Sequence, residues 1–216
     1  MHFNAQTLAV VGLTSLGIVV SAPVLAKGFS RRGKGVRYES NFVIQRAPQL
    51  MALLSIAIIV ISFLAYNAEL NAPFLVPAFA LTNSHPEGVV RIISWIGFLI
   101  MLSGFIFMIG GWYSLGEAFS TDAEILEGQK VRSTGLLAFV MHPVYSGIIQ
   151  SLFGASLAAT SPVGVLFVVG VVAPMWLNRA KYEEKMLIES LGQDYKDYAE
   201  RMGWRRLVPR FFPIGV

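Results

Sequence analysis

The sequence contains no cysteine and few charged residues. Without cysteine, the chain has no disulfide, no zinc–thiolate site and no thiol nucleophile. Charged residues make up 14% of the 216 positions, whereas a soluble domain usually has about 25%. Hydrophobic residues make up 55% of the chain. This balance argues against a soluble protein and favours a membrane protein.

The charged residues that are present lie between long apolar runs. A helix that spans a bilayer needs about 20 predominantly apolar residues, and the uncharged runs reach this length. We therefore predict an all-α, polytopic helical membrane protein, with residues 1–216 forming a single integral membrane domain. The four uncharged runs are Leu8–Ala26, Leu50–Asn67, Ile92–Gly116 and Met141–Asn178.

The last run is too long for one span, and Pro162 divides it. Proline disfavours helix at the preceding residue and suits the first turn of a new helix. We therefore predict a C-terminal helical hairpin and about five transmembrane helices in all. An amphipathic tail helix ended by Gly192 follows, and then a short helix at Gln193–Met202. The predicted spans are Leu8–Leu25, Met51–Tyr66 and Val90–Leu115 within residues 1–115, then Pro143–Ala158 and Pro162–Trp176 within residues 116–216.

A basic loop at Lys27–Ser40 gives the predicted orientation. Its five cations face a single acidic residue, Glu39. Because basic loops stay on the cytosolic side, we place this loop and the C-terminal tail inside, and the N-terminus and the loop Asn67–Gly88 outside. The first run lacks the preceding basic residues of a signal peptide, so we expect it to be retained. The position of the basic loop beside apolar helices argues against a nucleic-acid partner.

One candidate site is the sequence from Gly135 to Gly147, which contains His142 and Tyr145 at the head of the hairpin. Residues three apart share a helix face, so the imidazole and the phenol should lie together. Ionisable groups at membrane depth are costly and favour a functional role. The alternative is that the two side chains only anchor the helix at the membrane interface.

The second candidate is the adjacent pair Glu183 and Glu184, directly after the last span. The alternative interpretation is a solvated helix face, with Glu184 paired to a neighbouring lysine at little gain in stability. A third stretch, Leu191–Tyr198, contains two tyrosines three residues apart. By itself it predicts only an interfacial helix.

Taken together, these clusters form an ordered series that resembles the isoprenylcysteine carboxyl methyltransferase family and its relatives, the phospholipid methyltransferases. The resemblance covers about residues 112–210. The sequence departs from the family pattern in two places: Gly135 is followed by leucines instead of Pro-Tyr, and Met141 replaces the usual arginine. The series consists of Gly135, His142-Pro143-x-Tyr145-x-Gly147, Glu183-Glu184, Leu187, Leu191-Gly192, Tyr195, Tyr198 and Pro209.

The resemblance implies methyl transfer from S-adenosylmethionine, on the cytosolic side of the membrane, to a lipophilic or membrane-associated acceptor. Membrane lipids and a prenyl or lipid substrate are the implied partners, and no metal is implied. His142 and Tyr145 are the implied catalytic residues. The implied cofactor-binding residues are Gly135, Val140, His142, Pro143, Tyr145, Glu183 and Glu184.

The acceptor is left open by the sequence. A carboxylate, as in isoprenylcysteine, is favoured and needs no general base, whereas a thiol or amine would need one, with His142 as the candidate. Two other functions compete. Sterol C14-reductases share a similar His-Pro-x-Tyr-x-Gly stretch and transfer hydride from NADPH, and a non-catalytic family member is suggested by Met141.

Overall fold

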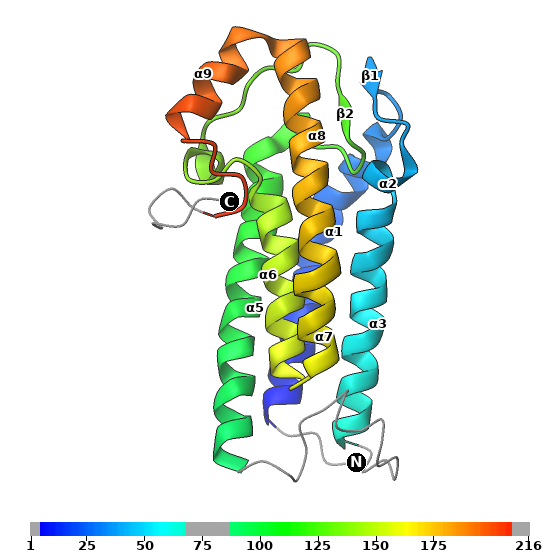
Figure 1. The fold of residues 1–216 in the computed structure, drawn as a ribbon, viewed down its shortest axis with the longest axis vertical. Coiled ribbons are helices and arrows are strands. Elements are labelled where there is room, and N and C mark those ends of the chain that lie inside the picture. The colour runs from blue at the N-terminus through cyan, green and yellow to red at the C-terminus, as the bar shows by residue number, and fades with distance from the viewer. Residues whose placement is uncertain (1–4, 68–86, 209–216) are drawn as a thin grey trace. The chain divides into compact units, whose positions relative to one another are not determined.

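The computed structural model describes residues 5–67 and 87–208, and within them the chain is mostly helical, with almost no sheet (Figure 1). Residues 68–86, which make up most of the predicted outer loop Asn67–Gly88, and the last residues of the tail lie outside these ranges. A π-helical turn, Val168–Val172, joins α7 to α8, and the short turns η1 and η2 are 3₁₀ helices. The elements are α1 Ala5–Arg31, β1 Arg37–Tyr38, α2 Phe42–Gln45, α3 Ala47–Asn67, α5 Glu87–Leu115, η1 Gly116–Ala118, β2 Glu124–Ile125, η2 Gly135–Ala138, α6 Pro143–Ala158, α7 Pro162–Phe167, α8 Ala173–Leu191 and α9 Gln193–Arg201.

Four of the described helices are long and apolar enough to cross a membrane, which confirms the predicted class of an all-α polytopic membrane protein. The fourth predicted span, α6, has 16 residues, fewer than the roughly 20 that a spanning helix needs. By length and composition the described part of the chain therefore offers four spans where we predicted about five. The four are Leu8–Arg31, Ala47–Ala65, Glu87–Ala118 and Pro162–Leu191.

The break at Pro162 is confirmed. The Ser161 side chain accepts a hydrogen bond from the Gly164 amide at 3.1 Å and caps the new helix. The predicted end of this helix at Trp176 is wrong, because the helix continues through the π turn to Leu191. We placed the end where the apolar run gives way to charged residues. Such a change marks where a helix leaves an apolar environment, but it does not end the helix. The helix stops at Gly192, as predicted, where φ is 62°.

The described residues fall into two compact units, each assembled from three segments of the chain. Unit 1 comprises Met1–Ile18, Gln49–Phe105 and Ile148–Pro174, and unit 2 comprises Val19–Pro48, Ile106–Gly147 and Met175–Val216. The boundaries of the two units fall inside helices, so several helices contribute to both. The prediction of a single domain is not tested by this division.

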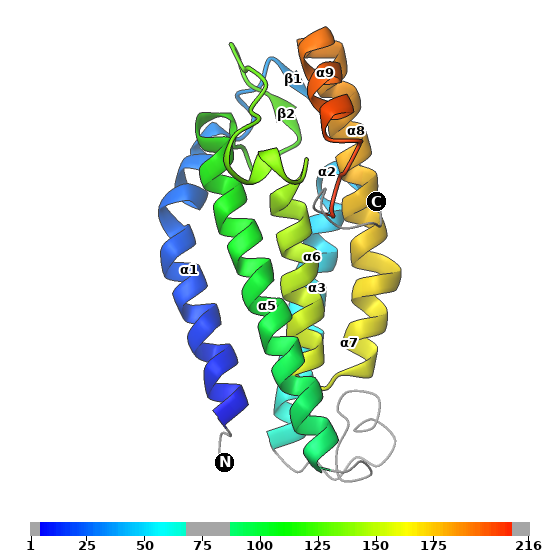
Figure 2. The ribbon, with the colours of Figure 1, turned by 90° about the vertical axis from the view of Figure 1, so that its left-hand side faces the viewer.

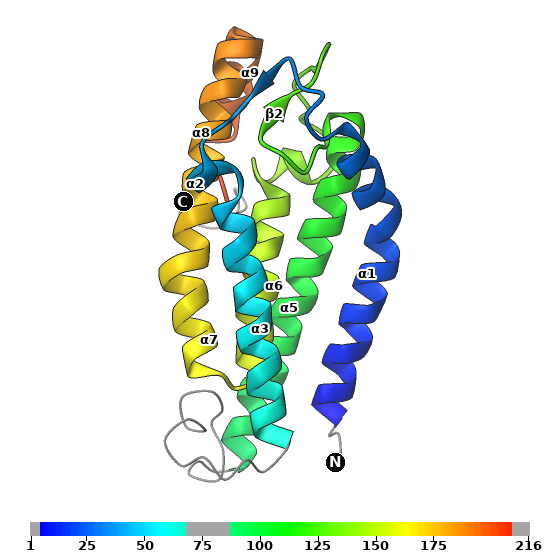
Figure 3. The ribbon, with the colours of Figure 1, turned by 90° about the vertical axis from the view of Figure 1, so that its right-hand side faces the viewer.

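In unit 1, glycines allow the backbones of α5 and α6 to touch (Figure 2). A Cβ atom on Gly97 would lie 2.3 Å from the Ala158 amide nitrogen, and one on Gly154 would lie 2.3 Å from the Met101 nitrogen. Small residues at such crossings let membrane helices pack closely. Helices α3 and α7 also lie side by side in unit 1 (Figure 3). The Ser62 hydroxyl on α3 hydrogen-bonds the Ser161 hydroxyl, which precedes α7, at 2.7 Å.

Unit 2 contains every cluster that the sequence analysis singled out. Strands β1 and β2 pair antiparallel, with Arg37 opposite Ile125 and Tyr38 opposite Glu124. The sequence analysis missed this pair, because two residues are too few to show an alternating pattern. A buried apolar cluster packs residues around β2 against the start of α6 and against α8 and α9. Its members are Ala123, Ile125, Met141, Met186, Leu187, Tyr195, Tyr198, Ala199 and Met202.

Candidate active site

His142 and Glu184 meet in the interior of unit 2. His142 lies at the start of α6 and Glu184 on α8, and their side chains are 7% and 4% exposed. The Nε2 atom of His142 lies 3.2 Å from Oε1 of Glu184. Arg206 approaches the same carboxylate, with its Nε atom 3.0 Å from Oε1 and 3.1 Å from Oε2. The buried carboxylate therefore has a cationic partner, which a buried charge requires.

Tyr145 and Glu183 form a second contact between α6 and α8. The Tyr145 hydroxyl donates a hydrogen bond to the Glu183 carboxylate and accepts one from Nε of Arg179 at 3.1 Å. The rings of His142 and Tyr145 stack with centroids 5.3 Å apart and planes at 4°. This confirms the prediction that the two residues share a helix face.

Arg179 connects this site to two other segments of the chain by hydrogen bonds. The sequence analysis did not assign it a role. Its side chain is among the largest fully buried ones, and the residue is 2% exposed. The guanidinium donates to the carbonyl oxygens of Gln45 at 2.9 Å and of Thr121 at 3.1 Å. It also lies 5.5 Å from the Trp176 ring centroid. The signal in the sequence was an arginine one helical turn before Glu183, at the end of an uncharged run.

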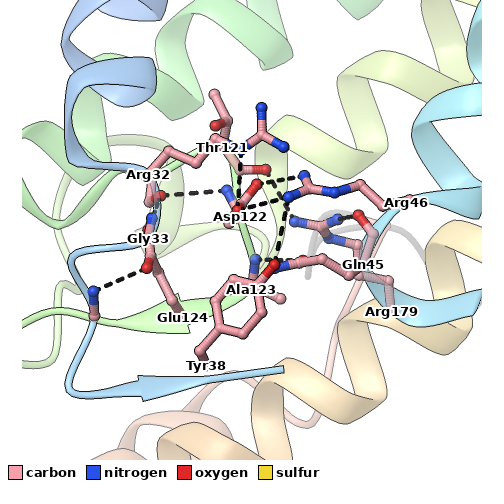
Figure 4. Close-up of polar contacts among 12 residues, drawn as sticks. Arg32, Gly33, Tyr38, Gln45, Arg46, Thr121, Asp122, Ala123, Glu124 and Arg179 are labelled. Carbon is pink, nitrogen blue, oxygen red and sulfur yellow. Dashed lines mark hydrogen bonds and ion pairs between the residues drawn. The ribbon is translucent and has the colours of Figure 1, made fainter. Parts of the chain in front are cut away.

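Asp122 forms the centre of a second polar cluster beside Arg179 (Figure 4). Its carboxylate accepts from Nη1 and Nη2 of Arg46 at 2.7 and 3.0 Å and from Nε of Arg32 at 3.2 Å. The hydrogen bond to Asp122 raises the pKa of Arg46 above its ordinary value. Gln45 adds a side-chain contact to the Ala123 amide at 2.8 Å. The basic loop, which we interpreted as an orientation signal, therefore also has a structural role.

Glu124 binds the same loop through backbone groups. Its carboxylate accepts from the amides of Gly33 at 3.2 Å and Gly35 at 2.9 Å, and from the Ser120 hydroxyl. Gly33 has a φ of 73°, a conformation that favours glycine. Its amide therefore points at the carboxylate without strain.

A cavity in unit 2 brings part of the predicted site together. His142, Pro143, Tyr145 and Glu183 line it. Its other lining residues include the apolar Leu115, Ala118, Phe119, Val131, Leu137, Met141, Val144, Leu187 and Leu191, the tyrosines Tyr195 and Tyr198, and the polar Ser120, Asp122, Glu124, Gln129, Lys130 and Arg132.

Three predicted cofactor-binding residues are not among the lining residues. Glu184 lies behind His142 and contacts it directly. Val140 is fully buried, and Gly135 begins η2 with a φ of 63°. The roles assigned to these residues, and to the four that line the cavity, remain predictions.

The three carboxylates that line the cavity differ in their partners. Asp122 has two arginines, and Glu124 has a hydroxyl and two amides. Glu183 accepts from the neutral Tyr145 hydroxyl. Within residues 5–67 and 87–208, no cationic side chain is hydrogen-bonded to it. Arg179 lies close enough to interact with Glu183 electrostatically, but it donates its hydrogen bond to Tyr145. Among the three carboxylates, Glu183 has the fewest hydrogen-bond donors and so the most remaining capacity to accept from a positively charged ligand.

The two tyrosines of α9 contribute to the apolar lining of the cavity. Tyr198 donates its hydroxyl to the Leu137 carbonyl oxygen at 2.8 Å, and burial raises the pKa values of both Tyr195 and Tyr198 above their ordinary range. Both hydroxyls therefore stay neutral. Met141 belongs to the same buried cluster, which explains physically why an apolar side chain is accepted there.

The segment after α9 pairs with the backbone at the head of α6. The amides of Met141 and His142 donate to the carbonyl oxygens of Arg205 and Arg206, both at 2.9 Å. Gly203 and Trp204, with φ values of 59° and 55°, turn the chain into this position. Arg206 was not predicted as a site residue, because nothing in the local sequence shows this pairing.

Comparison with known proteins identifies related chains. The family model described as phospholipid methyltransferase matches residues 92–194. A methanethiol S-methyltransferase from a Pseudomonas species (strain GM41) is 29% identical over 141 residues, which cover 64% of this chain and 52% of the relative. Protein-S-isoprenylcysteine O-methyltransferase B from Arabidopsis thaliana is 27% identical over 112 residues, covering 51% and 57%.

The matched region of the family model includes His142, Tyr145, Glu183 and Glu184. The resemblance predicted from the sequence is therefore confirmed. The chain spans about half the length of the curated relatives it matches. Arg206 lies beyond the region that the family model matches.

Proposed function

We propose that this chain, which resembles the isoprenylcysteine carboxyl methyltransferase-like group of membrane methyltransferases, transfers a methyl group from S-adenosylmethionine to a lipophilic carboxylate. The observation that carries the proposal is Glu183, a carboxylate that lines the cavity and is fixed by Tyr145 without a hydrogen-bonded cation. A carboxylate in this state attracts a positively charged ligand.

The residues of the cavity fit S-adenosylmethionine, which contains a sulfonium, an ammonium group and an adenine. Glu183 would hold a positive group, with Tyr145 fixing the carboxylate. The aliphatic and aromatic wall at Leu187, Leu191 and Tyr195 would pack against the adenine. His142 lines the same cavity, with Glu184 behind it. Gly135, Val140 and Pro143 are proposed as backbone contributors by family analogy.

The bound cofactor supplies an electrophilic methyl group, and the protein contributes mainly by positioning. Tyr145 and Arg179 fix Glu183 through consecutive hydrogen bonds. Buried side chains held in one geometry are the means by which a site orients its reactants. A carboxylate acceptor is already deprotonated, so no side chain has to remove a proton. His142 would act as a general base only toward a thiol or an amine.

Two cations at the cavity favour an anionic acceptor. Lys130 and Arg132 line the cavity and are exposed, and neither forms an ion pair with another of the described residues. Leu115, Phe119 and Val144 give the same cavity an apolar side. An apolar molecule that ends in a carboxylate matches both features. The two relatives differ on this point, since one is named for an O-methyl transfer and the other for an S-methyl transfer.

The acceptor assignment can be tested with the variants Lys130→Gln and Arg132→Gln. For a prenylated cysteine carboxylate we expect the KM to rise by about tenfold or more, since a hydrogen bond to a charged group is lost. The affinity for S-adenosylhomocysteine should stay unchanged. Weaker S-adenosylhomocysteine binding with an unchanged acceptor KM would contradict the proposal and assign the two cations to the cofactor's own carboxylate.

The competing functions are separated by the ligand that binds. The full chain in detergent should bind S-adenosylhomocysteine and not NADPH. Binding of NADPH alone would indicate a reductase, which the comparisons do not favour. Binding of neither would indicate a non-catalytic protein. Either of these two results would overturn the proposal.

A further inference from the structure

We propose that Arg206 is a positioning residue that sets the tautomer of His142 through Glu184. An effect of Arg206 on catalysis would rest on the proposed function. The effect of Arg206 on the tautomer of His142 does not depend on that function. The inference starts from three side chains in one line of contact: the imidazole, the buried carboxylate and the guanidinium.

The backbone brings Arg206 to this place. The amide of His142 donates to the carbonyl oxygen of Arg206, and the amide of Met141 to that of Arg205, both at 2.9 Å. These two bonds fix the segment after α9 alongside the head of α6. The Arg206 side chain then reaches Glu184 on α8, with Nε 3.0 Å from Oε1. Its guanidinium also lies 5.9 Å from the centroid of the Trp204 ring. This cation–π contact restricts the conformations of the Arg206 side chain.

The charge state of Glu184 follows from this contact. Its side chain is 4% exposed, and a buried carboxylate stays ionised only when it is paired. Arginine is always protonated in proteins, so it supplies that partner permanently. An ionised carboxylate only accepts hydrogen bonds. The His142 nitrogen that faces Glu184, which is Nε2, must therefore carry a hydrogen.

The other ring nitrogen of His142 is left without a hydrogen when the ring is neutral. Because His142 lines the cavity, Nδ1 is then a hydrogen-bond acceptor for a ligand bound there. The hydrogen bond made by one ring nitrogen sets the state of the other in this way at many histidine sites. Arg206 would thus shape the cavity without lining it, since it is not among the lining residues.

Removal of the guanidinium should change the state of the imidazole. In Arg206→Gln, the buried carboxylate loses its permanent cation. The remaining partner, His142, is then stabilised with hydrogens on both nitrogens. Arg206→Lys keeps a positive charge at this position and should restore the single hydrogen on Nε2. A matched control is Arg201→Gln, which removes an exposed arginine of α9.

Nitrogen NMR of the full chain with ¹⁵N-labelled histidine reads the tautomer directly. The chain has three histidines, and the loss of signals in His142→Gln assigns the one of interest. At a pH where the other histidines are neutral, we expect Nε2 of His142 in the protonated range and Nδ1 in the unprotonated range. Arg206→Gln should move Nδ1 toward the protonated range, while Arg201→Gln and Arg206→Lys should not.

A hydrogen on Nδ1 in the unsubstituted protein would overturn the proposal, as would an unchanged His142 spectrum in Arg206→Gln. These outcomes are independent of catalysis, so they are distinguishable from a failure of the proposed function. If that function holds, Arg206→Gln should also lower the rate of methyl transfer at subsaturating cofactor, because a cationic His142 at the cavity opposes the binding of a positively charged cofactor.

Discussion

The Tyr145 hydroxyl donates a hydrogen bond to the Glu183 carboxylate, across 38 positions of sequence. This bond joins α6 to α8 at the cavity and gives the two adjacent glutamates different surroundings. Glu183 faces the cavity, whereas Glu184 lies between His142 and Arg206. The two residues should therefore respond differently to the same substitution.

Glu183→Gln should weaken the binding of S-adenosylhomocysteine by about tenfold or more, because the amide keeps the shape and removes the charge. Tyr145→Phe should give a smaller loss, since it frees the carboxylate without removing it. Calorimetry in detergent measures both effects. Glu189→Gln, on the exposed part of α8, serves as the control. Normal binding by Glu183→Gln would mean that this carboxylate does not contact the cofactor.

Arg179→Gln should destabilise unit 2 by at least about 3 kcal/mol, because it removes two charged hydrogen bonds to backbone carbonyl oxygens. Arg179→Lys should recover only part of the loss, since an ammonium group cannot match the fork of the guanidinium. Thermal unfolding in detergent, followed by tryptophan fluorescence, gives the comparison. If the Tm of Arg179→Gln equals that of the exposed control Arg201→Gln, Arg179 does not hold these segments together.

The buried tyrosines predict how stability changes at alkaline pH. Burial raises the pKa values of Tyr195 and Tyr198, whereas an unfolded tyrosine ionises near pH 10. Above about pH 10 the unfolded state binds fewer protons than the folded one, so the free energy of unfolding falls as pH rises. Below that pH these two groups have no effect. The double variant Tyr195→Phe/Tyr198→Phe should show a shallower alkaline decline, and an identical decline would contradict this assignment.

The absence of cysteine makes the predicted orientation simple to test. In separate variants, Lys34→Cys and Glu87→Cys place one thiol on each side of the predicted α3 span. An impermeant maleimide applied to intact cells should label Glu87→Cys and spare Lys34→Cys until the cells are opened. This pattern follows from the positive-inside rule. The reverse pattern would place the basic loop, and the site with it, outside.

The sequence predicted the long helices and the breaks at Pro162 and Gly192, because apolar runs, proline and glycine act locally. It did not predict that the last apolar helix continues past Trp176 to Leu191. It also singled out His142, Tyr145, Glu183 and Glu184 as candidates, since these residues stand out against uncharged surroundings, and the structure brings their side chains into contact. In each case the signal lies within a few residues of the feature it predicts.

The remaining contacts depend on residues far apart in the chain. Arg179 reaches Gln45 across 134 positions, Arg46 reaches Asp122 across 76, and Arg206 reaches Glu184 across a helix end. No periodicity or motif records such pairings, and each charged residue alone was equally compatible with a solvated surface. Only the fold distinguishes a buried, paired charge from an exposed one.

Transfer of a labelled methyl group tests the central claim most directly. Membranes containing the full chain should convert S-adenosylmethionine labelled in its methyl group and a prenylated cysteine carboxylate into a labelled methyl ester, which alkali cleaves with release of methanol. Membranes with Glu183→Gln should give much less ester at the same protein level and subsaturating cofactor. Absence of any labelled ester from the unsubstituted chain, or label found instead in a thioether formed from a small thiol, would contradict the proposed methyl transfer to a lipophilic carboxylate.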